Sequence, residues 1–266
     1  MESEFTSLET YEKFFDTNIY LETYFTESGL CYTNGYMQFI MENMFKTFTS
    51  GGVRGDILLD IGFAPIIYQL LSACDSFKEI IKADFLEESR QELQSWLKNK
   101  PGAFDWTAVV KLACELEGGR KKWTEKEAKL RGKVKRVLKC NITQSNPLDP
   151  LVLPAVDCLI TCLCLEAVCK DKHTFCCALK NISSLLKPGG YLIMGGVLGE
   201  TGYMVGERKF SCLLLDKEFL GQAIPESGYK LLQLLTHFPN NQEPTSLADY
   251  DGYFFILAQK RQTKTI

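Results

Sequence analysis

Short apolar runs alternate with longer amphipathic segments along most of the chain. Asp56–Ile61 (DILLDI) predicts a buried first strand, and Pro65 then suits the first position of a helix over the sequence IIYQLLSA. Glu79–Phe85 predicts a second strand, and Glu87–Lys98 the helix that follows it. Strands that alternate with helices in this way predict an α/β fold, in which helices cover both faces of a mostly parallel sheet.

The same alternation continues to the end of the chain. Thr124 and Glu127 fit a capping box at the start of a helix whose apolar positions Leu130, Val134 and Val137 recur at helical spacing. The further predicted strands are Val137–Ile142, Val156–Leu165, Tyr191–Leu198, Lys230–Phe238 and Asp251–Lys260, and the further predicted helices are His173–Leu186 and Asp216–Ser227.

Two stretches stand apart from this order. Residues 1–50 are rich in aromatic side chains, and Tyr20 and Tyr24 share one face if the segment is helical. We expect this segment to close over a site at the sheet edge; the alternative is that its rings only dock it on the core. Residues 86–135 form a long connection, expected to be an insertion packed on the same core. No linker interrupts the chain, so residues 1–266 are expected to form one domain.

Charge and composition exclude several classes of function. A formal net charge of −3, from 30 basic and 33 acidic residues, provides no field for holding nucleic acid or an anionic membrane. The acidic start of the chain is unlike a signal peptide, and no apolar run reaches the ~18 residues of a membrane span. A cytoplasmic location is therefore expected. Without an obvious exposed apolar seam, a monomer is expected as well.

The chain carries eleven cysteines, most of them inside apolar runs such as DCLITCLCLEAVC. In a reducing compartment a free cysteine behaves as a small buried hydrophobe. A metal site among Cys158, Cys162, Cys164 and Cys169 is not expected, because a strand would split them between its two faces and no CxxC pair exists.

Ligands of open α/β sheets bind at the carboxyl ends of the strands. Asp60-Ile61-Gly62 ends the first predicted strand, and Gly62 would let a ligand approach the backbone. Asp84 ends the second strand, 84 − 62 = 22 residues further on, where its carboxylate could accept both hydroxyls of a ribose. A turn aspartate is the alternative. A nicotinamide cofactor is disfavoured because the loop lacks the three glycines of G-x-G-x-x-G.

The ends of the next two strands add further candidates. Asn141 places an amide where an adenine amino group could pair with it, although it could also be a simple turn residue. The fourth strand ends near Leu163–Glu166.

Several long, collinear strings resemble one known family. DILLDIG..P.IYQLLSACDSFKEI, QELQSWLK..PGAFDW, ACELEG, RVLKC, LLKPGGYL and YMVGERKFS are similar to the family of nicotinamide, indolethylamine and phenylethanolamine N-methyltransferases, most closely the first two. The resemblance runs over nearly the whole chain and implies a class I methyltransferase with a seven-stranded Rossmann-like sheet. It also implies S-adenosylmethionine as methyl donor and a small acceptor, an amine or a thioether.

The resemblance also assigns site residues by position. Donor contacts are implied at Tyr20, Phe25, Gly62, Phe63, Tyr68, Asp84, Ser89, Asn141, Ile142 and Leu163, and acceptor contacts at Gly196, Glu200, Tyr203 and Cys212. No catalytic acid or base is assigned, because a sulfonium donor is already activated and the protein mainly aligns the reactants and excludes water.

The chain departs from the family pattern in its first loop. The family reads Asp-Ile-Gly-Ser-Gly-Pro, whereas this chain has Phe63 for the serine and Ala64 for the second glycine. Phe63 adds bulk beside the methionine portion of the donor, and Ala64 would be strained if its position needed a positive φ. Asn141 replaces an aspartate, Ser89 an asparagine and Phe25 a tyrosine.

The acceptor positions also differ. Gly196 falls where the nicotinamide enzymes have an aspartate, while Glu200 and Cys212 each replace a serine. Glu200 could recruit a cationic amine, although a solvated loop carboxylate is the simpler interpretation. The sequence therefore predicts methyl transfer to an indolethylamine-like amine or a thioether. A paralogue that binds without catalysis is the main alternative, and an unrelated nucleotide-binding protein is the weaker one.

Overall fold

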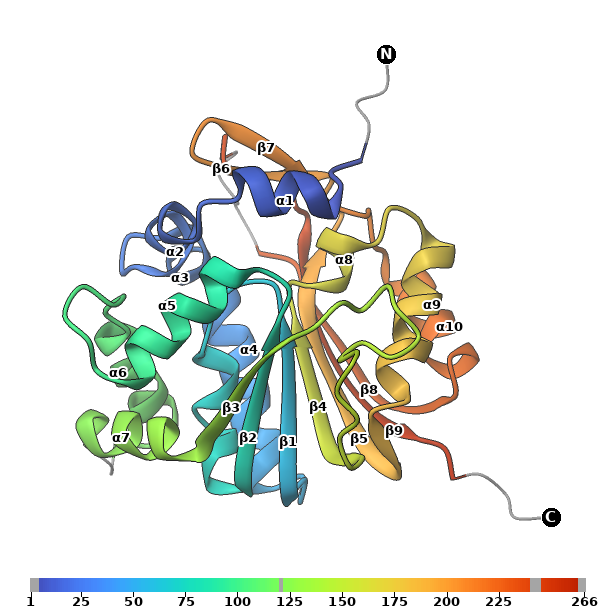
Figure 1. Cartoon of the computed structure of the whole chain (residues 1–266), viewed down its shortest axis with the longest axis horizontal. Helices are drawn as coiled ribbons and strands as arrows, with labels where there is room; N and C mark the ends of the chain where they lie inside the picture. The colour runs from blue at the N-terminus through green and yellow to red at the C-terminus, as the bar shows by residue number, and fades with distance from the viewer. Residues whose placement is uncertain (1–4, 120–121, 240–244, 263–266) are drawn as a thin grey trace.

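The computed structural model describes residues 5–119, 122–239 and 245–262. Within them, seven strands form one sheet in the order β3-β2-β1-β4-β5-β9-β8 (Figure 1). These strands are β1 (Gly55–Gly62), β2 (Phe77–Asp84), β3 (Val134–Lys139), β4 (Val156–Cys162), β5 (Leu186–Leu198), β8 (Tyr229–His237) and β9 (Gly252–Lys260). All neighbours from β3 to β5 are parallel, and β9 runs antiparallel to both β5 and β8. The predicted α/β class and mostly parallel seven-stranded sheet are confirmed.

Helices cover both faces of this sheet. The helices are α1 (Leu8–Phe14), α2 (Thr17–Phe25), α3 (Leu30–Thr33), α4 (Tyr36–Thr49), α5 (Glu87–Leu97), α6 (Thr107–Leu116), α7 (Trp123–Lys133), α8 (Leu165–Val168), α9 (Lys172–Ser183) and α10 (Lys217–Glu226). In Figure 1, α4 to α7 lie on one side of the sheet and α9 and α10 on the other. Two helices differ from the sequence prediction: the one expected before β2 and the one before β3.

The segment after β1 is not the predicted α-helix. It forms two short 3-10 turns, η1 (Tyr68–Leu70) and η2 (Ala73–Asp75). Every residue from Ile66 to Leu71 is buried, so the segment has no polar face to present to solvent as an amphipathic helix would.

The predicted capping box was also wrong. α7 begins one residue before Thr124, and its cap position, Lys122, makes no side-chain hydrogen bond to the helix. The helix ends at Lys133, because Val134 and Val137 belong to β3, where β-branched side chains are favoured.

A second, two-stranded sheet consists of β6 (Gly202–Val205) and β7 (Arg208–Ser211), which the sequence did not reveal. Figure 1 shows this hairpin together with α1 and α2 at the end of the main sheet where the parallel strands finish. Tyr11 of α1 and Tyr203 of β6 share a hydrogen bond of 3.0 Å between their hydroxyls. Segments from both ends of the chain therefore cover the sheet edge where ligands bind in such folds.

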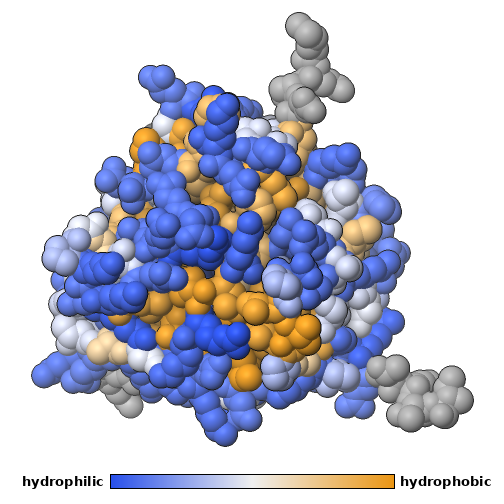
Figure 2. Space-filling view, viewed as in Figure 1, coloured by the Kyte–Doolittle hydropathy of each residue, from blue (hydrophilic) through white to orange (hydrophobic). Residues whose placement is uncertain are grey.

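Most of the apolar side chains are in one continuous core, but some reach the surface. Figure 2 shows apolar surface on the face crossed by the connection between β3 and β4, which carries the exposed Leu151 and Val152. All eleven cysteines are free, and nearly all are buried or partly buried, as predicted. None of the helices in the described ranges combines the length and apolar character that a membrane span needs.

Candidate active site

The first two strands bring four polar or small positions to one face at the edge of the sheet. In their parallel register Asp60 is the partner of Lys82, and Gly62 is the partner of Asp84. Alternate residues of a strand share a face, so all four lie together beside the carboxyl ends of the strands. Gly62 and Asp84 are therefore neighbours across the first two strands.

Asp84 keeps a carboxylate oxygen free for a ligand. It is only 2% exposed, and its Oδ1 accepts a hydrogen bond of 2.9 Å from the backbone N–H of Leu86. Its Oδ2 is buried without a partner in the described structure. Burial raises the pKa of Asp84 to about 7, against the opposing effect of Lys82. A buried acceptor of this kind suits a ligand that supplies hydroxyl donors.

Lys82 and Asp60 form an ion pair in which both side chains are fully buried. Gln69 also donates to Oδ2 of Asp60, at 3.0 Å. Burial raises the pKa of Asp60, and the Lys82 ammonium opposes that change. A Cβ atom built on Gly62 would lie 3.2 Å from Nζ of Lys82, so the ammonium sits directly beside the loop that follows β1.

The Phe63 ring is buried in the loop after β1. It is 4% exposed and meets Tyr11 edge-on, with ring centroids 4.4 Å apart. On another side it stacks with Phe85 at 6.2 Å. The predicted strain at Ala64 is absent, because neither Phe63 nor Ala64 has a positive φ. Bulk, and not backbone strain, is what these two substitutions contribute.

Only a small void remains among these groups. It measures about 10 Å³ and is bordered by Gly62, Phe63, Phe85, Asn141 and Ile142, among others. Such a volume holds about one water molecule.

Asn141 lies beside this void but uses its amide oxygen within a turn. Its Oδ1 accepts from the backbone N–H of Thr143 at 3.0 Å and from the Thr143 hydroxyl at 2.7 Å. The amide N–H groups are left for a ligand, so Asn141 suits an acceptor atom better than the expected adenine amino group.

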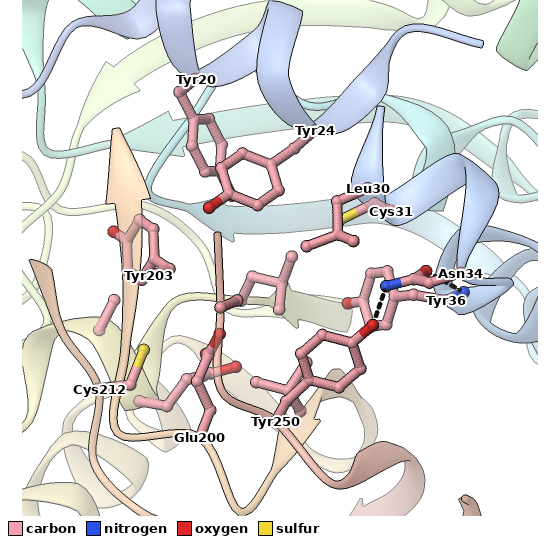
Figure 3. A pocket seen from close by; sticks show the side chains of 15 residues that line it. Tyr20, Tyr24, Leu30, Cys31, Asn34, Tyr36, Glu200, Tyr203, Cys212 and Tyr250 are labelled. Atoms are coloured by element: carbon pink, nitrogen blue, oxygen red, sulfur yellow. Dashed lines mark hydrogen bonds between the residues drawn. The ribbon is translucent and has the colours of Figure 1, made fainter. Parts of the chain in front are cut away.

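A second cavity, of about 50 Å³, is lined by fifteen residues, of which five are tyrosines. We call it the tyrosine cavity. Its lining residues are Tyr20, Tyr24, Leu30, Cys31, Asn34, Tyr36, Leu163, Glu166, Ala167, Val197, Glu200, Tyr203, Cys212, Ala248 and Tyr250 (Figure 3). Helices α2 to α4 supply one wall, and β6 with the adjoining loops supplies the opposite wall. Five of the predicted site residues are therefore brought together.

Two carboxylates face this cavity. Glu200 is 7% exposed, so the interpretation as a solvated loop carboxylate was wrong: its side chain lines the tyrosine cavity (Figure 3). Burial raises the pKa of Glu200 to about 8, and the charge of Glu166 raises it further. Burial likewise raises the pKa of Glu166 to about 7, and its Oε1 has no partner among the described residues. Two buried carboxylates in one aromatic cavity favour a ligand that is cationic or donates hydrogen bonds.

Cys212 and Tyr203 flank Glu200. Burial raises the pKa of the Cys212 thiol well above the usual value, and the charge of Glu200 raises it further. The Tyr203 ring is stacked on Phe210 at 5.8 Å and shares its hydroxyl hydrogen bond with Tyr11. These contacts hold the acidic wall in place.

Gly196 does not line the tyrosine cavity, but it makes room for a residue that does. A Cβ at this position would lie 2.5 Å from Oε1 of Glu166 and 2.7 Å from the Phe254 ring. The carboxylate of Glu166 thus occupies the space beside position 196.

Three predicted donor residues support the site from outside the two cavities. Phe25 stacks on Tyr68 at 5.9 Å, and the Tyr68 hydroxyl is 3.0 Å from that of Tyr36. Ser89 shares a hydrogen bond of 3.2 Å with Thr17, which ties α2 to α5. These residues position the walls of the site.

Leu163, directly after β4, has a positive φ of 50°. Its backbone N–H donates to the carbonyl of Gly195 at 3.0 Å. A left-handed conformation is costly for leucine, and such residues concentrate at functional sites.

Sequence reasoning missed Glu166 and Lys82 as site residues. Both were visible as charged residues in apolar surroundings: Glu166 follows the run CLITCLCL, and Lys82 interrupts the strand EIIKADF. A charge inside a buried strand needs a partner, and this signal could have linked Lys82 to Asp60.

Solved structures share this fold. A magnesium protoporphyrin IX methyltransferase from Synechocystis, solved with bound S-adenosylmethionine, superposes with a TM-score of 0.56, covering 94% of this chain and 93% of that one at 10% identity. A S-adenosylmethionine-dependent methyltransferase from Clostridium acetobutylicum gives 0.53, covering 86% and 92% at 13% identity. The strand order and the acidic residue ending β2 define the class I fold of S-adenosylmethionine-dependent methyltransferases.

Comparison of sequences is more specific. Residues 2–261 match the NNMT/PNMT/TEMT family. Rabbit indolethylamine N-methyltransferase is 46% identical over 98% of this chain and 99% of its own length, and human nicotinamide N-methyltransferase is 46% identical over 98% of each. Human phenylethanolamine N-methyltransferase is 41% identical over 92% of this chain and 89% of its own length. The chain therefore belongs to the NNMT/PNMT/TEMT family, as its sequence strings predicted.

Proposed function

We propose that this protein is an S-adenosylmethionine-dependent methyltransferase that methylates a small amine. The observation that carries this proposal is the pair of buried carboxylates, Glu166 and Glu200, in a tyrosine-walled cavity next to Asp84 and Gly62. Its relatives, named as N-methyltransferases of indolethylamine, nicotinamide and phenylethanolamine, support the reaction class. They do not favour the alternative of a non-catalytic binding protein.

The residues at the strand ends carry groups suited to the nucleoside part of the donor. The free Oδ2 of Asp84 would accept from the ribose hydroxyls, and Asn141 and Ile142 would contact the adenine. Tyr20, Leu163 and the Phe25–Tyr68 stack would border the sulfonium, with Ser89 holding α2 in place. When bound, the donor supplies an activated methyl group, so the protein needs only to align the acceptor and exclude water.

We assign the acceptor to the tyrosine cavity. A protonated amine would be held by Glu166 and Glu200, and a carboxylate with a pKa of about 7 or 8 can take up the proton that the amine must lose to become a nucleophile. Tyr203, Cys212 and the glycine at position 196 shape this wall. Tyrosine faces nearby would stabilise the positive charge.

A thioether acceptor, which the sequence also allowed, is the weaker candidate. It has no proton to give and no charge, so binding it would leave two buried carboxylates without a partner. Nicotinamide is disfavoured for a related reason, because a neutral pyridine ring offers less to two carboxylates than a cationic amine does.

We assign residues 1–50 the role of a lid and residues 86–135 that of an insertion on a single domain spanning 1–266. The hydrogen bond of 2.8 Å from the Tyr24 hydroxyl to the carbonyl of Met204 supports a lid that closes on the β6–β7 hairpin. We further propose that this chain acts as a monomer, in the cytoplasm.

The test measures transfer of a labelled methyl group from S-adenosylmethionine to tryptamine, phenylethanolamine, nicotinamide and dimethyl sulfide. We expect turnover of an amine, with nicotinamide and dimethyl sulfide at least about tenfold poorer in kcat/KM. The substitutions Glu200→Gln and Glu166→Gln should each lower kcat/KM for the amine by about tenfold or more.

Glu207→Gln is the matched control, because this glutamate lies exposed in the turn between β6 and β7. It should leave kcat/KM unchanged. Efficient turnover of nicotinamide, or amine turnover that is indifferent to both buried glutamates, would overturn the assignment of the acceptor.

A further inference from the structure

The end of the donor site that faces the loop after β1 is filled by the chain's own side chains. Phe63 lies between Tyr11 and Phe85, and the void that it leaves holds about 10 Å³, the volume of roughly one water molecule. In this fold the loop after the first strand is the part that a bound nucleotide approaches most closely. The ring of Phe63 therefore stands where the amino-acid portion of the donor would pass.

A cation is already present at the same place. The Lys82 ammonium is fully buried, is paired with Asp60, and would lie 3.2 Å from a Cβ on Gly62. The donor's amino-acid end carries both an ammonium and a carboxylate. The Lys82 ammonium repels the former in a buried region, and its attraction for the latter is weakened because Lys82 is already paired with Asp60.

The opposite end of the site keeps its ligand-binding atoms, although the same small void also borders Asn141 and Ile142. Asp84 retains its partnerless Oδ2, and Asn141 uses its amide oxygen, not its N–H groups, in the hydrogen bonds to Thr143. Groups that would recognise a ribose and an adenine are thus preserved, whereas the groups beside Gly62 oppose an amino-acid tail.

We propose that Phe63 and Lys82 occupy the amino-acid subsite, so that this chain recognises its donor by the nucleoside portion and gains little affinity from the amino-acid tail. This inference rests on the proposed function and deepens it. It follows that adenine nucleosides without the tail compete with the donor and with the demethylated product. Phe63 acts by excluding volume, and Lys82 acts by charge.

Calorimetry with two ligands tests this inference. S-adenosylhomocysteine carries the amino-acid tail, and 5′-methylthioadenosine lacks it. For the unaltered chain we expect dissociation constants within about threefold of each other. Phe63→Ser should tighten S-adenosylhomocysteine by about tenfold or more and leave 5′-methylthioadenosine within about threefold.

The triple variant Phe63→Ser, Lys82→Met and Asp60→Asn should bind S-adenosylhomocysteine more tightly still. Its affinity for 5′-methylthioadenosine should not change further. Phe14→Ser is the matched control, since Phe14 lies on the same helix as Tyr11 but is exposed. It should change neither dissociation constant. If the triple variant does not fold, Phe63→Ser and Phe63→Ala decide the question by themselves.

Other results would distinguish failure of the subsite inference from failure of the methyltransferase proposal. Binding of S-adenosylhomocysteine more than about tenfold tighter than 5′-methylthioadenosine in the unaltered chain overturns this inference and leaves the methyltransferase proposal intact. An equal effect of Phe63→Ser on both ligands also overturns it. If neither ligand binds the unaltered chain or the Phe63→Ser variant, the inference and the proposed function both fail.

Discussion

Gly196 and Glu166 occupy one space: a Cβ on the glycine would stand 2.5 Å from the glutamate's Oε1. The glutamate is buried, and its position on the cavity wall requires the absence of a side chain at 196. The glycine at position 196 is therefore coupled to the placement of the Glu166 carboxylate on the cavity wall.

This coupling predicts a non-additive pair of substitutions. Gly196→Ala should lower the free energy of unfolding by about 1–3 kcal/mol, because the added methyl group overpacks the site. In a Glu166→Ala background the same change should cost less, although the Phe254 ring at 2.7 Å keeps part of the penalty. Denaturant unfolding of the double-mutant cycle measures this difference. Strict additivity would show that Glu166 does not occupy that space.

The buried Lys82–Asp60 pair predicts a large single-site effect. Lys82→Met leaves a charged Asp60 without its partner and should cost about 3–5 kcal/mol of unfolding free energy. Adding Asp60→Asn should restore most of this loss, since both charges are then gone. Thermal and urea denaturation would measure both variants.

The same two strands offer the control for that measurement. Lys78 and Asp56 are paired at 2.7 Å, with side chains 80% and 62% exposed. Lys78→Met should cost at most about 1 kcal/mol, because a surface pair gains little over its solvated ions. Similar costs for the two lysines would contradict a structural role for the buried pair.

The pH dependence of stability follows from Glu200 and Glu166. Their pKa values in the fold, about 8 and about 7, lie above the ordinary value of 4.5, so the folded chain holds protons that the unfolded chain releases. Stability is therefore greatest below about pH 5 for these groups and falls as the pH rises towards 8. Glu200→Gln should flatten this fall and be more stable than the parent at pH 8, whereas Glu207→Gln should not change it. Urea unfolding between pH 5 and 8 gives the comparison; a parent whose stability rises over this range would contradict the burial of these carboxylates as acids.

At position 163, glycine should stabilise the fold relative to alanine, whereas elsewhere it usually destabilises it. At a φ of 50° alanine is strained and glycine is not, so Leu163→Gly should be about 1 kcal/mol more stable than Leu163→Ala. The two variants differ in their side chains by one methyl group only, so their difference mainly reports the backbone. If alanine is the more stable of the two, the left-handed conformation at this position is wrong.

The sequence predicted the sheet well because its strands are short apolar runs bounded by clear turns, as in Asp56–Ile61 and Glu79–Phe85. It failed where tertiary burial overrides local pattern. Ile66–Leu71 is buried on all sides and contains a 3-10 turn in place of a helix, and Val134 begins a strand in place of ending a helix.

The site was predicted in part. Gly62 and Asp84 could be placed together because parallel strands end at one edge, and Tyr203 and Glu200 came from the family resemblance. Burial of Glu200 could not be foreseen, since it depends on helices and a hairpin from distant parts of the chain. The left-handed Leu163 has no sequence signal at all, because leucine is a poor residue for that conformation.

The closure of the first helices on the β6–β7 hairpin has a consequence for biosynthesis. Thr6 bonds Ser211 at a separation of 205 residues, and Tyr11 bonds Tyr203 at 192. A chain emerging from the ribosome exposes the aromatic helices α1 and α2 long before their partners are translated. The apolar rings of these helices stay exposed until the residues around position 211 have been translated. A chaperone that binds nascent chains would therefore bind these helices.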